Sequence, residues 1–279
     1  MVDAATRPPS LALVHIPKTG GTALQRALGG NGDLTRGGSL RRPWCARDFL
    51  VRAHGSTVPW ALSQNRTPVV TLRNPYARFF SAFQYWRHGS KDFPRSTAAP
   101  GNISFQRFAH ALGDRTDPLH RYAMGIVAGH NDESRWVWYV HFLRQTHWAQ
   151  QAHENRTIFV CYGEGGSSDS GGTAAEARAV PPTDILVATS QALAHHNITC
   201  NLSALRRNPI GQPPVPRRPG SRSRTIANAV APLWLVNPTI NKPRIPAYGS
   251  LSIAARNYIH RAYHWDFELH QRHCGSRIT

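Results

Sequence analysis

Residues 11–28 constrain the fold of this chain more than any other stretch. Residues 11–16 are a short apolar run, which predicts a buried strand. Residues 23–28 carry apolar side chains at helical spacing, and either Thr19 or Thr22 is placed to cap that helix. A strand, a glycine-rich turn and a helix in this order aim backbone N–H groups and a helix N-terminus at an anion.

The side chains of this turn suit phosphate or a phosphate-like ligand. Lys18 adds a positive charge, and Thr19 and Thr22 add hydroxyl donors. The turn is not a Walker A loop, because Lys18 precedes Gly20 and Gly21 instead of following the glycines. The alternative is an ordinary strand-to-helix turn with a surface lysine.

A second strand-to-helix stretch supports the first. Residues 68–73 predict another buried strand, and Asn74 and Pro75 are the residues expected at a helix start. Arg73 then stands at the carboxyl end of the strand, with Ser81 on the helix, which is predicted to run to residue 88. A dianionic phosphate is bound well by a guanidinium fork and a hydroxyl donor. The alternative is a surface arginine and a helix serine without a special role.

The two stretches together resemble the nucleotide site of sulfotransferases that use PAPS (3′-phosphoadenosine 5′-phosphosulfate). The segment His-Ile-Pro-Lys-Thr-Gly-Gly-Thr at residues 15–22 resembles their 5′-phosphosulfate loop, and residues 69–83 resemble their 3′-phosphate site. The resemblance is to the carbohydrate branch, which includes the heparan sulfate 6-O-sulfotransferases. It implies two groups of cofactor-binding residues, Pro17, Lys18, Thr19, Gly20, Gly21 and Thr22 on the phosphosulfate and Arg73 and Ser81 on the 3′-phosphate. Asn74 departs from the family pattern, which has Asp after the arginine.

The resemblance also implies a catalytic histidine between the two motifs. His54 is the only histidine there. An imidazole titrates near neutral pH and can take the proton of an acceptor hydroxyl, while Lys18 binds the bridging oxygen as charge develops. The alternative for His54 is a structural role, since the chain holds 15 histidines.

Composition favours a globular protein with polyanionic partners. Lys and Arg number 33 against 15 Asp and Glu, a formal charge of +18, which attracts nucleic acid, anionic membrane or an acidic glycan. The four cysteines lie far apart, so we expect no zinc site or other metal; they permit two disulfides without requiring them.

The compartment is predicted from short motifs alone. Five N-x-[ST] sequons, an excess over chance, favour a secretory lumen and a glycoprotein. Carbohydrate sulfotransferases carry a membrane anchor into the Golgi, and this chain has no apolar run long enough to span a membrane. We therefore expect the Golgi lumen, with any membrane attachment through an anchor absent from this chain; a soluble cytoplasmic enzyme is the alternative.

The remaining pattern predicts an α/β fold with a P-loop-like parallel sheet flanked by helices, as in sulfotransferases. We expect a single domain over 1–279, with mobile loops at 163–172 and 206–224. Further strands are expected at 157–162 and 184–189, a short strand or helix at 47–52, and helices at 59–64, 105–112, 121–127, 134–151, 191–195 and 251–273.

The predicted function is transfer of a sulfuryl group from PAPS to a hydroxyl on a carbohydrate, with in-line attack, a histidine base and no metal. The acceptor is expected to be a carbohydrate, with a polyanionic glycan as one option and no nucleic acid. Residues 135–148 mix aromatic and basic side chains, which suits either a glycan cleft or a core-facing helix. Two alternatives remain, a basic nucleic-acid-binding protein and another P-loop-like nucleotide enzyme.

Overall fold

The computed structural model describes residues 10–28, 49–51, 56–88, 103–128, 140–162, 185–200, 202 and 245–275. Several predicted features lie outside these ranges. They are His54, the loops at 163–172 and 206–224, and the first part of the helix expected at 134–151.

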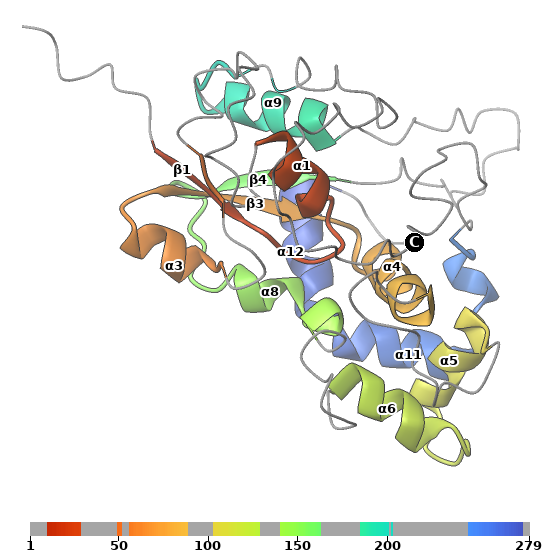
Figure 1. Ribbon diagram of the computed structural model, residues 1–279. Helices are drawn as coiled ribbons and strands as arrows, with labels where there is room; N and C mark the ends of the chain where they lie inside the picture. Colours follow the sequence, from red (N-terminus) through yellow and green to blue (C-terminus); the bar gives the residue numbers. More distant parts are fainter. Residues whose placement is uncertain are drawn as a thin grey trace, which may run out of the picture.

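Four parallel strands form one sheet in the order β2-β1-β3-β4 (Figure 1). Leu13 of β1 pairs with Val51 on one side and Val69 on the other, and Val70 of β3 pairs with Phe159. The strands are β1 Leu11–Val14, β2 Phe49–Val51, β3 Thr67–Leu72 and β4 Ile158–Cys161. With helices on both faces of this sheet, the chain has an α/β fold, as the alternation of elements predicts.

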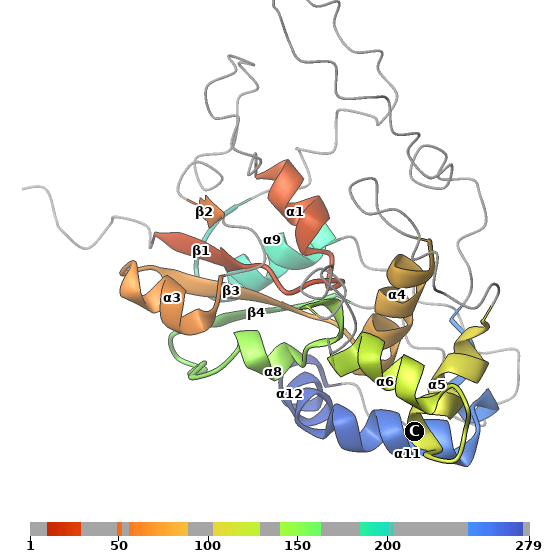
Figure 2. The same ribbon diagram turned by 60° about the horizontal axis from the view of Figure 1, so that its bottom comes forward.

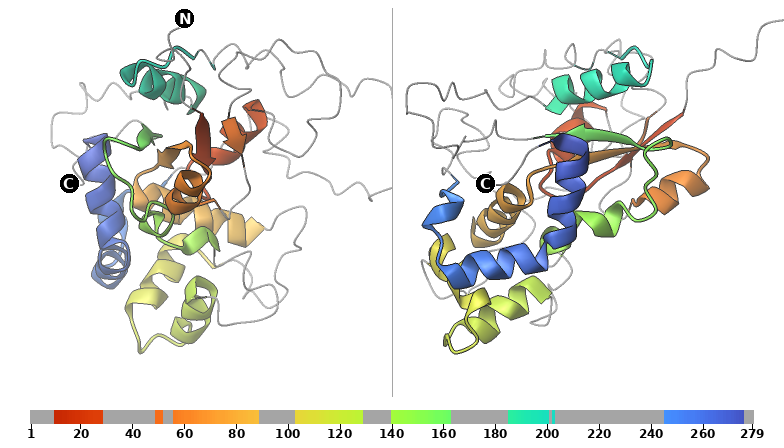
Figure 3. Two further views of the ribbon diagram at one scale, coloured as in Figure 1. Left: turned by 90° about the vertical axis from the view of Figure 1, so that its left-hand side faces the viewer. Right: turned by 180° about the vertical axis from the view of Figure 1, so that it is seen from behind.

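Helices lie on both faces of the sheet (Figure 3). Side chains that alternate along the strands enter two separate apolar layers between the sheet and these helices. Leu11, Leu13 and Val69 face α1 (Gly21–Ala27) and α9 (Ile185–His195). Ala12, Val14, Val70 and Leu72 face the opposite layer. That layer is built by α3 (Val58–Ser63), α8 (Gln145–Trp148) and α12 (His264–Cys274). Both faces of the sheet are therefore buried.

A helical assembly lies beside the sheet and is held by aromatic rings (Figure 2). It is formed by α4 (Pro75–His88), α5 (Phe105–Gly113), α6 (His120–Ala128), η3 (Tyr248–Ser250) and α11 (Ile253–Ala262). We call Phe79, Phe83, Trp86, Phe105 and Phe108 the aromatic cluster. Its rings lie close together, with centroids 5.1 Å apart for Phe83 and Phe108 and 5.3 Å apart for Trp86 and Phe108. Such pairs add stability beyond the area they bury.

Most of the predicted elements are confirmed. The strands expected at 11–16, 68–73 and 157–162 are β1, β3 and β4, and the ambiguous segment 47–52 contains strand β2. The helix expected from Pro75 to residue 88 is α4, and Asn74 caps it: Asn74 Oδ1 accepts hydrogen bonds from the N–H groups of Tyr76 (3.0 Å) and Ala77 (3.2 Å).

The strand predicted at 184–189 is wrong, because Ile185 begins helix α9. A short apolar run with β-branched residues fits a buried helix as well as a strand. Here its apolar side chains cover one face of the sheet. The hydroxyls of Thr189 and Ser190 donate to the carbonyls one turn earlier, at 2.6 and 2.9 Å, as they do inside helices.

Two long predicted helices are broken. The one expected at 134–151 is interrupted at residues 143–144, and α8 starts anew at Gln145. The one expected at 251–273 is two helices, α11 and α12, separated by Tyr263. The hydroxyl of Tyr263 donates to the carbonyl of Phe142 at 2.8 Å, so the side chain at the break is fixed inside the protein.

A disulfide joins Cys161 at the end of β4 to Cys274 at the end of α12, with 5.5 Å between their Cα atoms. Cys200, which follows α9, is also disulfide-bonded. The sequence permitted these bonds without requiring them. The Cys161–Cys274 bond fixes the sheet to α12, on one of its faces.

Candidate functional site

The carboxyl ends of the parallel strands bring three segments together at one edge of the sheet. β1 leads into residues 15–22, which we call the glycine turn; β3 leads into Arg73, and β4 into Tyr162. The guanidinium carbon of Arg73 lies 5.8 Å from the centroid of the Tyr162 ring. This edge is where ligands bind in open parallel sheets. Sequence analysis missed Tyr162, because nothing in the β4 segment marks it.

The glycine turn is held from within by Thr19, which is fully buried. Its hydroxyl donates to the carbonyl of Ile16 at 2.8 Å and lies 2.6 Å from the hydroxyl of Thr71. This hydroxyl therefore holds the turn from within, and the contact of Thr19 with a phosphosulfate stays a prediction. Thr22 lies inside α1 with an exposed side chain, and its hydroxyl is 3.5 Å from Nε2 of His15.

Gly20 and Gly21 of the glycine turn occupy positions where a side chain would be strained or would clash. Gly20 has φ +81°, and a Cβ there would lie 3.2 Å from Ile185 and 3.3 Å from Tyr162. A Cβ on Gly21 would lie 2.2 Å from the ring of His15, which is buried beneath it. The glycines let the turn pack tightly on its supports. Because α1 has only seven residues, attraction for an anion has to come mainly from side chains.

Three basic side chains gather on the glycine turn. Arg73 Nη1 donates to the carbonyl of Lys18 at 3.2 Å, and Arg78 Nε donates to the carbonyl of Pro17 at 2.9 Å. The Lys18 ammonium lies 3.2 Å from the centroid of the Tyr85 ring, a cation–π contact. Lys18 itself has φ 67°, in the left-handed region. A non-glycine residue held in this region is a form of strain that collects at functional sites.

Burial and mutual repulsion disfavour the positive charges of these basic side chains. Burial, and then the positive charges of Arg73 and Arg78, hold the pKa of Lys18 well below its ordinary value. Burial also lowers the pKa of Arg78, an effect that the carboxylate of Asp266 opposes. An anion bound beside these groups would reverse the effect of the neighbouring cations on Lys18.

Arg78 is the functional candidate that sequence analysis missed. It is among the largest fully buried side chains of the described residues, and within these residues its Nη2 atom has no hydrogen-bond partner. A buried guanidinium nitrogen without a partner is rare in folded proteins and indicates a water molecule or a ligand oxygen. Arg78 precedes Ser81 by three residues and Tyr85 by seven on α4, so the three share the helix face toward the glycine turn. Ser81 is partly buried there.

A buried polar network fixes the backbone of Arg73. Gln145 Oε1 accepts from the N–H of Arg73 at 3.0 Å, and Gln145 Nε2 donates to its carbonyl at 2.8 Å. Asp266 then accepts from the N–H groups of Gln145 (2.7 Å) and Thr146 (2.9 Å), which start α8. Gln145 and Asp266 are fully buried. Asp266 therefore positions Gln145, and Gln145 in turn fixes the backbone of Arg73.

The predicted base, His54, lies outside the described residues, between β2 and Ser56. The chain leaves β2 at the same edge of the sheet as it leaves β1. Ser56 is fully buried, and its hydroxyl accepts from the N–H of His15 at 3.1 Å. The described residues on both sides of His54 are therefore anchored close to the first residue of the glycine turn.

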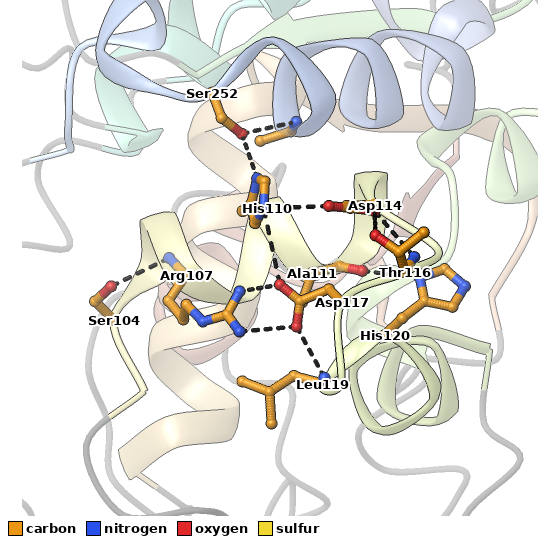
Figure 4. A network of polar contacts seen from close by, with 11 residues as sticks. Ser104, Arg107, His110, Ala111, Asp114, Thr116, Asp117, Leu119, His120 and Ser252 are labelled. Atoms are coloured by element: carbon orange, nitrogen blue, oxygen red, sulfur yellow. Dashed lines mark hydrogen bonds and ion pairs between the residues drawn. The ribbon is translucent and has the colours of Figure 1, made fainter.

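A second polar cluster joins α5, the start of α6 and the start of α11 (Figure 4). His110 Nδ1 lies 2.9 Å from the hydroxyl of Ser252, and His110 Nε2 lies 3.8 Å from Asp117. Asp117 also binds Arg107 through both carboxylate oxygens. The Ser252 hydroxyl accepts from the N–H of Ala255 at 3.2 Å as the cap of α11. This Ser–His–Asp arrangement therefore joins helices, and we assign it no catalytic role.

Comparison of the sequence with family models, with curated proteins and with solved structures finds no match. Within the described residues, no three His, Cys, Asp or Glu side chains are grouped so as to hold a metal ion. None of the helices in the described ranges is long and apolar enough to cross a membrane. The function of the site is therefore argued from its own geometry.

Proposed function

We propose that the chain is a PAPS-dependent sulfotransferase with the P-loop-like fold of that family, acting on a hydroxyl of a carbohydrate. The observation that carries this proposal is the gathering of Lys18, Arg73 and Arg78 around one turn at the ligand-binding edge of a parallel sheet. The groups that shift the pKa of Lys18 besides burial are both cations. Three basic groups in partly or fully buried positions are costly unless an anion joins them.

The residues fit the two phosphate ends of PAPS. Lys18 and the backbone N–H groups of the glycine turn suit the 5′-phosphosulfate. Arg73 and Ser81 suit the 3′-phosphate. The buried, unsatisfied Nη2 of Arg78 adds a donor that was not predicted. The Thr19 hydroxyl holds the turn from within by donating to the carbonyl of Ile16.

PAPS, when bound, supplies an activated sulfuryl group on a good leaving phosphate. His54 would accept the proton of the acceptor hydroxyl as the new S–O bond forms. Lys18 would neutralise the phosphate oxygen as its bond to sulfur breaks, releasing 3′,5′-ADP. Arg73, fixed by Gln145, would hold the nucleotide so that the acceptor oxygen attacks in line.

We also propose that the protein works in an oxidising lumen, that of the Golgi. Disulfides persist in such compartments and are rare in the cytosol, and both Cys161–Cys274 and the bond at Cys200 are formed. Three sequon asparagines lie in the described residues, and all three are exposed, as acceptors of N-glycans must be. They are Asn65, Asn155 and Asn197.

Transfer of radioactive sulfate from labelled PAPS tests the proposal. A panel of neutral and acidic oligosaccharides serves as acceptor. We expect label in at least one acceptor, and His54→Gln is expected to lower the rate by about 10²–10⁴-fold, the usual contribution of a general base. Its affinity for 3′,5′-ADP should stay unchanged, which separates loss of catalysis from loss of folding. A rate in His54→Gln equal to that of the wild type would remove His54 from the mechanism.

A further inference from the structure

A surface groove between α8 and α12 carries side chains that the proposed transfer site does not use. Its volume is about 700 Å³. Residues from the α8 segment form one wall, including Arg144, Thr146 and Gln150. Residues spaced three or four apart on α12 form the other wall, including Trp265, Glu268 and Arg272. This spacing places them on one face of the helix.

Trp265 is the feature of the groove that most needs an explanation. Its side chain is 56% exposed, and it is one of only two large hydrophobic residues exposed in the described ranges. The neighbouring aromatic residues Tyr263 and Phe267 are buried. An exposed indole lining a groove offers a flat apolar surface with a polar N–H edge, which is suited to a ligand that is itself amphipathic.

The polar groups around Trp265 are mixed in sign. Arg144 and Arg272 are exposed and present guanidinium forks for a carboxylate or a sulfate. Glu268 brings a carboxylate, which lies 3.0 Å from Nε2 of His264. Gln150 adds an amide, and Thr146 adds a hydroxyl that already donates to Asp266 at 3.1 Å and can still accept a hydrogen bond. The groove therefore offers an apolar plane, two cations, neutral hydrogen-bonding groups and one negatively charged hydrogen-bond acceptor, the Glu268 carboxylate.

We propose that this groove binds an acidic saccharide. The apolar C–H face of a sugar ring would stack on Trp265, and its acidic substituent would pair with Arg144 and Arg272. Its hydroxyls would donate to Glu268, a carboxylate that repels any phosphate or carboxylate group placed directly against it. A saccharide with both hydroxyls and an acidic group matches the whole set.

The groove is separate from the nucleotide site, and the inference does not rest on the proposed transferase activity. On α8, the buried Gln145 points to Arg73, whereas Arg144, Thr146 and His147 line the groove. The two sites thus lie on different sides of one short helix. Each is tested by its own ligand.

Calorimetric titration of the full chain without nucleotide tests the groove. The probes are a uronate-containing, sulfated octasaccharide, a neutral octasaccharide of glucose, and an oligonucleotide of equal charge. We expect only the acidic saccharide to bind tightly. Trp265→Ala and the double variant Arg144→Ala/Arg272→Ala should each weaken it at least tenfold. The matched controls Ile253→Ala and Arg121→Ala change an exposed apolar residue and an exposed cation outside the groove lining, and they should weaken it less than twofold.

Equal losses in the control variants, or unchanged binding in Trp265→Ala, would overturn the proposal, because binding would then be to the general positive charge. Equal binding of the oligonucleotide with the same dependence on Trp265 would assign the groove to nucleic acid instead. Lys18→Met should leave saccharide affinity unchanged while it weakens binding of 3′,5′-ADP. If only nucleotide binding failed, the result would contradict the proposed transferase activity and would not affect the proposal that the groove binds a saccharide.

Discussion

The glycine turn and the aromatic cluster both contact α4, and they differ in almost every physical property. The cluster packs apolar rings in close contact around Phe79 and Phe108. The glycine turn instead holds a half-buried lysine in a left-handed conformation, beside the half-buried Arg73 and the fully buried Arg78. One face of α4 thus stabilises the fold, whereas the other carries an arrangement that costs stability. Such local cost is typical of a binding site, where a ligand offsets it.

Truncation in the aromatic cluster should give the largest loss of stability and the smallest change in the site. Phe108 is fully buried and its ring contacts Phe83, Trp86 and Phe142. We expect Phe108→Ala to lower the free energy of unfolding by about 3–5 kcal/mol, the usual cost of removing a core phenyl ring. Chemical denaturation measures this loss. Affinity for 3′,5′-ADP at low temperature should stay within about twofold; a loss equal to that of Arg73→Ala would contradict the separation of the two regions.

The Cys161–Cys274 bond links the sheet to α12, which carries Asp266. Removing it tests whether the site depends on that helix. We expect Cys274→Ser to lower the free energy of unfolding by about 2–5 kcal/mol, as for other long disulfide loops. It should also weaken 3′,5′-ADP binding modestly, because Asp266 positions Gln145 and hence Arg73. Unchanged stability in the oxidised state, measured by denaturation, would show that the bond contributes nothing.

Acid should destabilise α12 through His270. Burial lowers the pKa of His270 to about 4, from 6.5 in the unfolded chain. Between these pH values the unfolded state binds more protons, so stability falls as pH falls from 6.5 toward 4. The expected loss is on the order of 2–3 kcal/mol. Denaturation at several pH values should show this slope in the wild type and a flatter one in His270→Leu; identical slopes would exclude His270 as the cause.

The smallest expected effect is a gain in stability, whereas Phe108→Ala and Cys274→Ser lose stability. Lys18→Met removes a buried charge, so we expect a gain of at most about 1 kcal/mol. Because the folded-state pKa of Lys18 is lowered, its cost is largest at low pH and vanishes as pH rises to the unfolded value near 10.5. The gain should therefore shrink with rising pH. A loss of stability in this variant would mean that Lys18 supports the fold.

The sequence predicted the parts of the fold that local patterns encode. β1 and β3 are apolar runs followed by clear turn and cap residues, and both were located from these signals. The strand predicted at Ile185 was wrong because the apolar run there fits either a strand or a helix, and only packing on the sheet decides between them. The helix breaks at Arg144 and Tyr263 were not predicted, because the groups that fix them are distant in sequence. Asp266 accepts from the N–H of Gln145 after the first break, and the carbonyl of Phe142 accepts from the hydroxyl of Tyr263 at the second.

The candidate site shows the same limit. Lys18, Gly20 and Arg73 stand in motifs and were found. Arg78 and Gln145 were missed, since their roles depend on contacts with Pro17 and Arg73 that no spacing in the sequence displays. Thr19 was expected to face the ligand, but its hydroxyl is used to hold the turn. Sequence patterns identified groups able to bind an anion, and tertiary contacts show which of them support the others.

The central claim is a site for a nucleotide with a 3′-phosphate, and calorimetric comparison of 3′,5′-ADP with 5′-AMP tests it most directly. We expect 3′,5′-ADP to bind at least tenfold more tightly to the wild type. Arg73→Ala should remove that preference, a loss of about 1.5–3 kcal/mol for charge-assisted hydrogen bonds, while the surface variant Arg121→Ala keeps it. Equal affinity for the two nucleotides in the wild type would contradict the account.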